Sequence, residues 1–293
     1  MKKSMDAVTN PKVHLVTVVG SHLEILPHML THYRNLGVDS ITVSIHLNAY
    51  DDLLYTRARR VCEEYSADIL SVYAGKWLEC VNQFLYHEAR HEHPTDWFIL
   101  ADVDELHVYP SEIHELFGSV ASEGYNYIEG CVIDRVARDG TLPNVISGVP
   151  IWDQFPLGGL ITSTLLGAEI RKVVAVRGLV PLTPGQHFAL SGNGCPIERL
   201  YVPVFHFKWF AGLAERLEKR VRFYQDNQDG IWQESQRFID YYYGHGQRID
   251  VIDPRFCIAD CSNGYPQWDA LKEIMLASAG KTVGAGTRTR SDQ

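Results

Sequence analysis

The amino-acid sequence predicts an α/β protein in which a mostly parallel sheet is flanked by helices. Over the first hundred residues, apolar segments rich in β-branched residues alternate with segments whose apolar residues recur at helical spacing. Such alternation indicates parallel βαβ units with right-handed crossovers. No GxGxxG pattern follows the first predicted strand, so we do not expect a dinucleotide-binding Rossmann domain.

The first two strand–helix units are marked by their end signals. Gly20 stops the first strand, Gly37 follows the last periodic residue of the first helix, and Asp51 with Asp52 can cap the second helix. The predicted elements are a strand at 13–19, a helix at 23–36, a strand at 40–47 and a helix from 51 to 65.

A third unit leads to a fourth, apolar strand. The predicted elements are a strand at 67–73, a helix at 77–92 that Pro94 ends, and a strand at 97–101. Asp102 follows the last of these directly. Ligands of open α/β sheets bind beyond the carboxyl ends of the strands, so we expect the functional site near Asp102.

Beyond residue 112 the pattern is looser. Strands are predicted at 125–133, 172–176 and 201–207, Arg-rich helices at 213–224 and 232–243, and a disordered polar tail after Gly280. We predict one domain over residues 1–245, with halves at 13–110 and 111–245. A C-terminal helical extension and the tail are expected at 246–293.

Composition narrows the class of protein. The 293 residues are 45% hydrophobic and 22% charged, as in globular proteins with a hydrophobic core. A net charge of −9 argues against nucleic-acid binding, which needs clustered Lys and Arg. Nothing near the N-terminus resembles an export signal, the run 13–19 is too short to cross a membrane, and the six cysteines form no CxxC pair. We therefore expect a cytoplasmic protein without a transmembrane segment.

Two aspartates at positions i and i+2 follow the fourth strand. Asp102 and Asp104 can turn toward one cation where the strand gives way to a turn, and Mg²⁺ or Mn²⁺ prefers carboxylate and phosphate oxygens. The alternative is an acidic loop that only solubilises the strand end. The parallel-sheet context favours a metal site, through which an acidic protein can bind an anionic nucleotide.

The segment Ile99-Leu-Ala-Asp-Val-Asp-Glu-Leu106, after three strand–helix units, resembles the DxD segment of GT-A glycosyltransferases. The chain is similar to a bacterial family-2-like group of these enzymes over residues 13–240, with matching stretches at 15–37, 152–156, 185–187 and 204–210. It departs from that group after the first two strands. Many relatives carry Asn-Glu and then an Asp-rich turn there, where this chain has Gly20-Ser-His-Leu-Glu24 and His46-Leu-Asn-Ala-Tyr-Asp51.

The resemblance implies a GT-A-like fold and transfer of a sugar, with inversion, from a nucleotide diphosphate donor. The donor would be a UDP-sugar, and the acceptor a hydroxyl or amine of a carbohydrate or small molecule. Residues 13–110 would bind the donor and 111–245 the acceptor, with Mn²⁺ or Mg²⁺ held by Asp102 and Asp104. The residues expected around the donor are Val18, Val19, Gly20, His46, Asn48 and Lys76.

His206 and Lys208 alternate on a strand-like segment, so we expect them on the same face. A neutral imidazole can complete the coordination of a metal, and a lysine ammonium can neutralise a departing diphosphate. The resemblance implies that His206 is the third metal ligand. The alternative is a surface pair flanked by core aromatic residues.

Three residues are candidates for chemistry on the acceptor side. The resemblance implies a general base well after the DxD segment, for which Asp153 is the first candidate and Asp134 its rival. Trp152 would offer a flat face to a sugar ring, and His187 follows Pro184-Gly-Gln, a turn that can present it to the site. The alternatives are loop acids that cap backbone N–H groups and a histidine that caps a loop.

One motif points elsewhere. His87-Glu-Ala-Arg-His91 matches HExxH, in which two histidines on one helical face bind zinc and the glutamate is the base of a protease. Pro94 ends the helix soon after, and no third histidine follows at metzincin spacing, so we interpret the match as chance. A zinc metalloprotease and a catalytically inactive sugar- or nucleotide-binding module are the alternatives to the enzyme.

Overall fold

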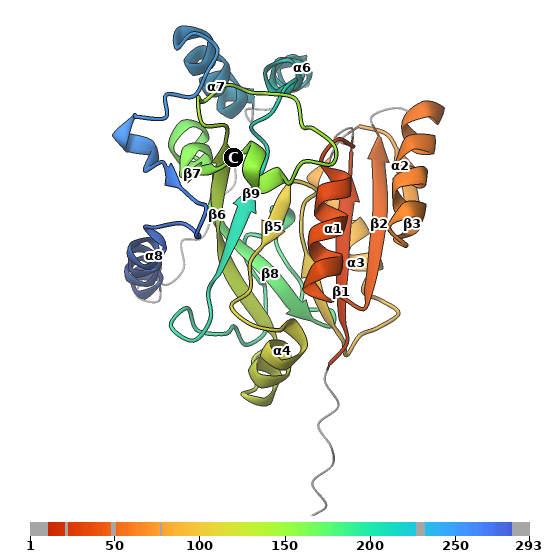
Figure 1. Ribbon diagram of the computed structural model, residues 1–293. Helices are drawn as coiled ribbons and strands as arrows, with labels where there is room; N and C mark the ends of the chain where they lie inside the picture. Colours follow the sequence, from red (N-terminus) through yellow and green to blue (C-terminus); the bar gives the residue numbers. More distant parts are fainter. Residues whose placement is uncertain (1–10, 21–22, 48–50, 77, 227–231, 283–293) are drawn as a thin grey trace, which may run out of the picture.

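Strands and helices alternate over the first hundred residues as the sequence predicts. The computed structural model describes residues 11–20, 23–47, 51–76, 78–226 and 232–282. The strands β1 (Val13–Val19), β2 (Ser40–Leu47), β3 (Asp68–Ala74) and β4 (Trp97–Leu100) alternate with the helices α1 (Leu26–Leu36), α2 (Asp52–Glu64) and α3 (Glu79–Glu88) (Figure 1).

These four strands are parallel. β1 pairs with β2 and β4, and β2 pairs with β3, so their carboxyl ends lie at one edge of the sheet, the top in Figure 1. Side chains of β1 are buried on both faces, because Leu15 packs in the cluster that holds Met29 of α1 and Val16 packs with Leu85 of α3. Coverage on both faces explains why this strand is an unbroken apolar run.

The second half of the chain extends the sheet. Its strands are β5 (Glu105–His107), β6 (Tyr127–Val136), β7 (Leu157–Gly159), β8 (Arg171–Arg177), β9 (Val202–His206) and β10 (Ala259–Asp260). β8 pairs antiparallel with both β4 and β6 and so joins the two halves into one ten-stranded sheet, ordered β10-β7-β6-β8-β4-β1-β2-β3. β9 lies off this path, parallel to β6 and antiparallel to β5.

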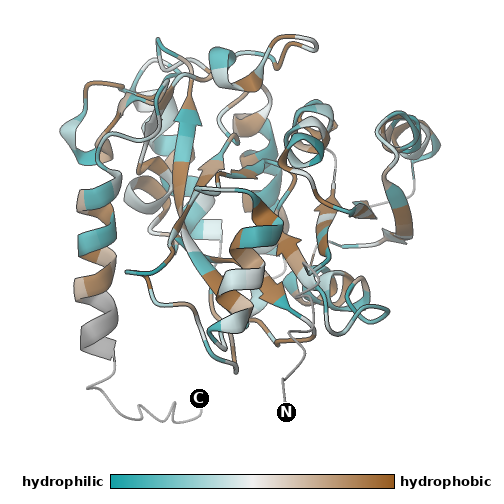
Figure 2. Ribbon diagram, turned by 60° about the horizontal axis from the view of Figure 1, so that its bottom comes forward, coloured by the Kyte–Doolittle hydropathy of each residue, from teal (hydrophilic) through white to brown (hydrophobic). Residues whose placement is uncertain are grey.

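The remaining helices flank this half. They are α4 (Ile113–Ser122), α5 (Ile151–Gln154), α6 (Leu213–Asp226), α7 (Trp232–Gly244) and α8 (Trp268–Thr282), with short helical turns at Thr162–Leu166, Pro184–Gln186 and Pro254–Phe256. α6 and α7 lie at the top of Figure 1, near the carboxyl ends of the parallel strands. Figure 2 shows hydrophobic residues along the central strands and hydrophilic residues on the outward sides of the helices.

The predicted fold class, an α/β sheet with central parallel strands flanked by helices, is confirmed. The helix of the C-terminal extension is α8, whose Leu271 and Met275 pack in the main core. The same region also adds β10 to the sheet beside β7, so residues after 246 complete an edge of the domain. The antiparallel strands β5, β7 and β10 are too short to give a sequence signal of their own.

Candidate active site at the carboxyl ends of the strands

Asp102 and Asp104 lie in the turn between β4 and β5. The Glu105 N–H donates to the Asp102 carbonyl (2.9 Å), and the Phe207 N–H donates to the Asp104 carbonyl (2.7 Å). These bonds hold the turn between the end of β4 and the end of β9. Both aspartates therefore lie beyond the carboxyl end of a central parallel strand, where the sequence predicted them.

Asp104 faces His206. Its Oδ2 lies 3.5 Å from His206 Nε2, while His206 Nδ1 lies 3.0 Å from Asp134 Oδ1. The three meet because β9 pairs His206 with Glu105 of β5 on one side and with Asp134 of β6 on the other. Burial lowers the pKa of His206, but Asp104 and Asp134 outweigh it and raise that pKa to about 10.

Asp134 is a support for His206. Its side chain is 1% exposed and accepts four hydrogen bonds, from the Thr162 N–H, the Thr162 hydroxyl, Trp209 Nε1 and His206 Nδ1. Burial would raise the pKa of Asp134, but His206, Lys208 and Thr162 hold it below its ordinary value. An acid held in this way fixes the orientation of the imidazole, as carboxylates that accept a hydrogen bond from a metal-binding histidine do.

The donor set fits a divalent cation. His206 bonds to Asp134 through Nδ1, so Nε2 is the nitrogen that faces Asp104. Two adjacent ligands of an octahedral cation with bonds of roughly 2.1 Å lie about 3 Å apart, close to the observed 3.5 Å. Asp102 lies two residues earlier in the same turn, where its Oδ1 accepts from the Tyr86 hydroxyl and its Oδ2 faces the Lys172 ammonium.

Lys172 of β8 belongs to the site, and the sequence did not single it out. Its ammonium lies 2.9 Å from Asp102 Oδ2 and 2.8 Å from Glu105 Oε1, and the Tyr86 hydroxyl donates to Asp102 Oδ1 (3.0 Å). Burial would raise the pKa of Glu105 and lower that of Lys172, but their attraction reverses both directions. Lys172 thus keeps Glu105 ionised and pairs with Asp102, whose pKa burial raises although Lys172 opposes that rise. The only signal for it was a lysine directly before the apolar run 173–176.

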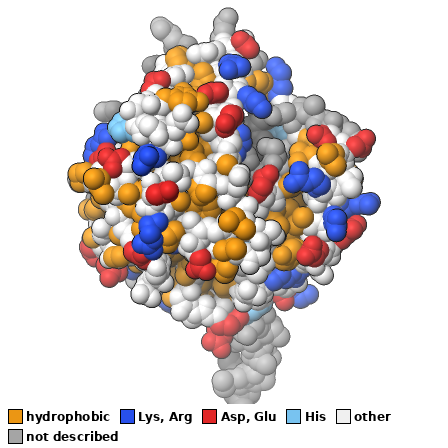
Figure 3. Space-filling view, turned by 45° about the horizontal axis from the view of Figure 1, so that its top comes forward, with side chains coloured by type: hydrophobic (Ala, Val, Ile, Leu, Met, Phe, Trp, Pro, Cys, Tyr) orange, Lys and Arg blue, Asp and Glu red, His pale blue; other side chains and the backbone are white. Residues whose placement is uncertain are grey.

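Basic side chains of α6 complete the surroundings of Asp104. Burial lowers the pKa of Arg216, and the nearby Asp104 opposes it. Burial also lowers the pKa of Lys208. The carboxylates of Asp134 and Asp104 oppose this shift, and the nearby Arg220 adds to it. Arg220 Nε is buried without a hydrogen-bond partner. Lys208 lies beyond the end of β9, two residues after His206, where a strand was predicted. Figure 3 shows basic and acidic side chains around a hollow on this face.

The other residues predicted to surround the sugar donor differ in burial and in location. Val18 and Val19 are buried core residues of β1, and Gly20 follows them half-buried. His46 is 2% exposed, with Nδ1 3.0 Å from Asn82 Oδ1 and Nε2 3.2 Å from the Lys76 carbonyl, so it ties β2 to α3 and to the loop before that helix. Lys76 is exposed, with its ammonium 5.5 Å from the Phe223 ring of α6. Asn48 lies outside the described residues.

On the acceptor side, Asp153 is exposed on α5. Trp152 is not the open platform that the sequence suggested, because its ring packs edge-on against Phe205 and Phe207 and over the Arg135 guanidinium. His187 bonds through Nδ1 to the Arg171 carbonyl (2.8 Å), as a loop-capping histidine does. Of the candidate base residues, Asp153 is therefore the one whose side chain is open to solvent.

Known proteins offer little direct comparison. No protein-family model and no curated protein matches the chain. Among solved structures, mannosyltransferase PcManGT from Pyrobaculum calidifontis, in complex with GDP-Man and Mn²⁺, is 11% identical, with 94% of this chain and 88% of that chain covered and a TM-score of 0.39. TarS of S. aureus is 7% identical at a TM-score of 0.37, and the match spans 80% of this chain but only 44% of TarS. The first of these is a mannosyltransferase by its description, but similarity at this level assigns no activity to this chain.

Within the described part of the chain, every helix is too short or too polar to cross a bilayer.

Proposed function

We propose that this chain is a metal-dependent glycosyltransferase that moves a sugar from a nucleotide diphosphate donor, a UDP-sugar, to an acceptor hydroxyl or amine with inversion. The observation that supports it best is the meeting of Asp104 and His206 beyond β4, in the turn that also carries Asp102. Carboxylate and imidazole donors on rigid strands suit Mn²⁺ or Mg²⁺. A divalent cation held there would neutralise charge on the leaving diphosphate.

The side chains around the pair suit an anionic donor. Asp104 interacts electrostatically with both Lys208 and Arg216, and Lys208 also interacts with Arg220. The buried Nε of Arg220 has no hydrogen-bond partner. Fixed cations in a partly buried site stabilise charge that develops on a leaving group. We assign Lys208 and the two arginines to the phosphates, and Lys76 to the nucleoside end beside α6.

The acceptor is expected on the side of α5. Asp153 is our candidate general base, because it is exposed there while the rival Asp134 is fully engaged with His206, Thr162 and Trp209. A base must reach the acceptor proton and be ionised at neutral pH. Asp134 becomes a positioning residue that holds the imidazole.

A ligand screen tests the proposal. UDP with Mn²⁺ or Mg²⁺ should raise the melting temperature, because a ligand that binds only the folded state stabilises it. Uridine with the same cation, and UDP with EDTA, should give much smaller shifts. GDP, tested in parallel with UDP, shows which nucleobase the site prefers. Stabilisation by no nucleoside diphosphate, or by UDP equally with and without EDTA, would contradict a metal-bridged diphosphate site.

Lys208 offers a sharper test of the phosphate contacts. Lys208→Ala should weaken UDP binding at least about tenfold, because a hydrogen bond to a charged group contributes roughly 1.5–3 kcal/mol. Uridine, which lacks the phosphates, should bind equally to parent and variant. Lys219→Ala is the matched control, since it removes the same charge from an exposed position on α6. Calorimetric titration measures all three proteins, and equal losses for UDP and uridine would place Lys208 outside the phosphate site.

A further inference from the structure

Two histidines and a glutamate converge at the end of α3, outside the site described above. His87, Glu88 and His91 each place one ligand atom within 4.8 Å of the others. The two imidazole rings meet edge to face with centroids 5.1 Å apart, and His87 Nδ1 lies 3.8 Å from a Glu88 carboxylate oxygen. The His87 and Glu88 side chains are 42% and 45% exposed, so a cation can reach them from solvent.

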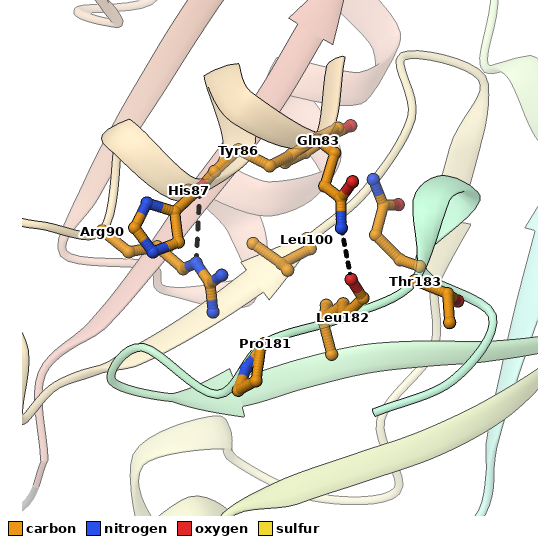
Figure 4. Close-up of a pocket in the computed structure, with 9 residues that line it drawn as sticks. Gln83, Tyr86, His87, Arg90, Leu100, Pro181, Leu182 and Thr183 are labelled. Atoms are coloured by element: carbon orange, nitrogen blue, oxygen red, sulfur yellow. Dashed lines mark hydrogen bonds between the residues drawn. The ribbon is translucent and has the colours of Figure 1, made fainter. Parts of the chain in front are cut away.

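The backbone that carries these three side chains is anchored. Arg90, 3% exposed, donates from Nε to the Tyr86 carbonyl and from Nη1 to the carbonyls of Gly178 (3.1 Å) and Val180 (3.0 Å). Figure 4 shows His87 beside this guanidinium, at a small pocket between α3 and Pro181–Thr183. The ligands can therefore close on a cation by side-chain rotation alone, without the cost of ordering a loop.

The chemistry of the donor set favours zinc over magnesium. Two imidazoles and a carboxylate are ligands that Zn²⁺ and other late first-row cations prefer, with water in the fourth position. A protease needs both histidines of HExxH on one helix face, and α3 ends at Glu88, three residues before His91. The arrangement thus supports metal binding but not the peptidase reading of the motif.

We propose that His87, Glu88 and His91 form a second metal site, of the zinc class, that braces the end of α3. This site shares no ligand with Asp104 and His206. It adjoins Tyr86, whose hydroxyl donates to Asp102, so it steadies the helix that supports the first aspartate without contact with the donor.

Zinc titration without nucleotide tests the site. The background is Asp104→Asn, which removes a ligand of the first site, and the variants added to it are His91→Ala and His93→Ala. We expect one Zn²⁺ to bind per chain and His91→Ala to weaken it by at least about tenfold, since even supporting residues of metal ligands cost that much. His93 is the matched control, 52% exposed two residues further on and outside the trio. Zn²⁺ should also raise the melting temperature of the background protein but not that of the His91 variant.

Three results would overturn the site: no zinc binding, equal affinity in the His91 variant, or an equal loss in the His93 variant. Circular dichroism checks that each variant is folded, and Glu88→Gln provides a second ligand variant at an exposed position. The measurement uses neither nucleotide nor sugar transfer, so it stands or falls independently of the proposed activity.

Discussion

Replacing Asp104 by asparagine is expected to abolish sugar transfer, by at least about 10²-fold, while the protein stays folded. An amide is a poor ligand for Mn²⁺ or Mg²⁺, and Asp104 is the carboxylate that faces His206 at 3.5 Å. The side chain is 18% exposed, and asparagine fills the same volume. Loss of its charge removes an attraction to His206 but also relieves repulsion with Asp102, and His206 keeps Asp134 as a partner. The variant should therefore melt within a few degrees of the metal-free parent.

Two measurements have to agree for this result to support the metal site. Parent activity should disappear with EDTA and return with Mn²⁺ or Mg²⁺, and excess cation should restore little activity to the variant. Asp68→Asn, an exposed acid on β3, is the control for the loss of one charge. A parent that is indifferent to EDTA would rule out the metal bridge, and a variant that unfolds would return Asp104 to a structural role.

Local sequence patterns were sufficient to predict the position of the two aspartates that follow β4. The apolar alternation from Val13 to Leu100 defines four strands, and Asp102 with Asp104 follows the last of them directly. Their position depends only on the order of strands and helices and on the edge at which parallel strands end. The placement of His206 was expected through resemblance, not periodicity. It reaches Asp104 because β9 inserts between β5 and β6, a pairing that no local pattern encodes.

Residues whose role depends on distant partners were not predictable. Lys172 is buried because two carboxylates 70 and 67 positions earlier meet its ammonium, and a lysine beside Arg171 at the start of a strand does not identify them. Trp152 was expected to face a sugar, but α5 turns its ring toward Phe205 and Phe207. Arg216 and Arg220 were visible only as part of an Arg-rich helix, since helical spacing does not tell which face meets a ligand.

Removal of the Lys172 ammonium is expected to cause the largest loss of stability. Lys172→Met keeps most of the side-chain volume but leaves Glu105, whose side chain is 4% exposed, without the cation that neutralises it. Breaking one partner of a buried ion pair costs roughly 3–5 kcal/mol of unfolding free energy. Urea unfolding at pH 7.5 measures the difference, and Lys219→Met, an exposed lysine, should change stability by less than about 0.5 kcal/mol.

The loss of stability in Lys172→Met should depend on pH, and its direction follows from the pKa of Glu105. In the parent, burial would raise the pKa of Glu105, but Lys172 holds it below the ordinary value of 4.5, so its contribution is present above that pH and is lost only in stronger acid. Without Lys172, burial is opposed only by His107, His206 and the Asp102 N–H, so we expect that pKa to rise and the variant to lose stability as the pH rises past the ordinary value. The gap between parent and variant should therefore be widest at pH 7.5 and narrow toward pH 4.5.

A second substitution separates charge from packing. In Lys172→Met with Glu105→Gln, the uncompensated carboxylate is gone, so much of the lost stability should return and its pH dependence should flatten. The double-mutant cycle then yields the coupling between the two residues directly. A single variant as stable as the parent at pH 7.5, or a gap of the same size at pH 4.5, would show that Lys172 does not neutralise Glu105. In that case another group would have to hold the turn that carries Asp102 and Asp104.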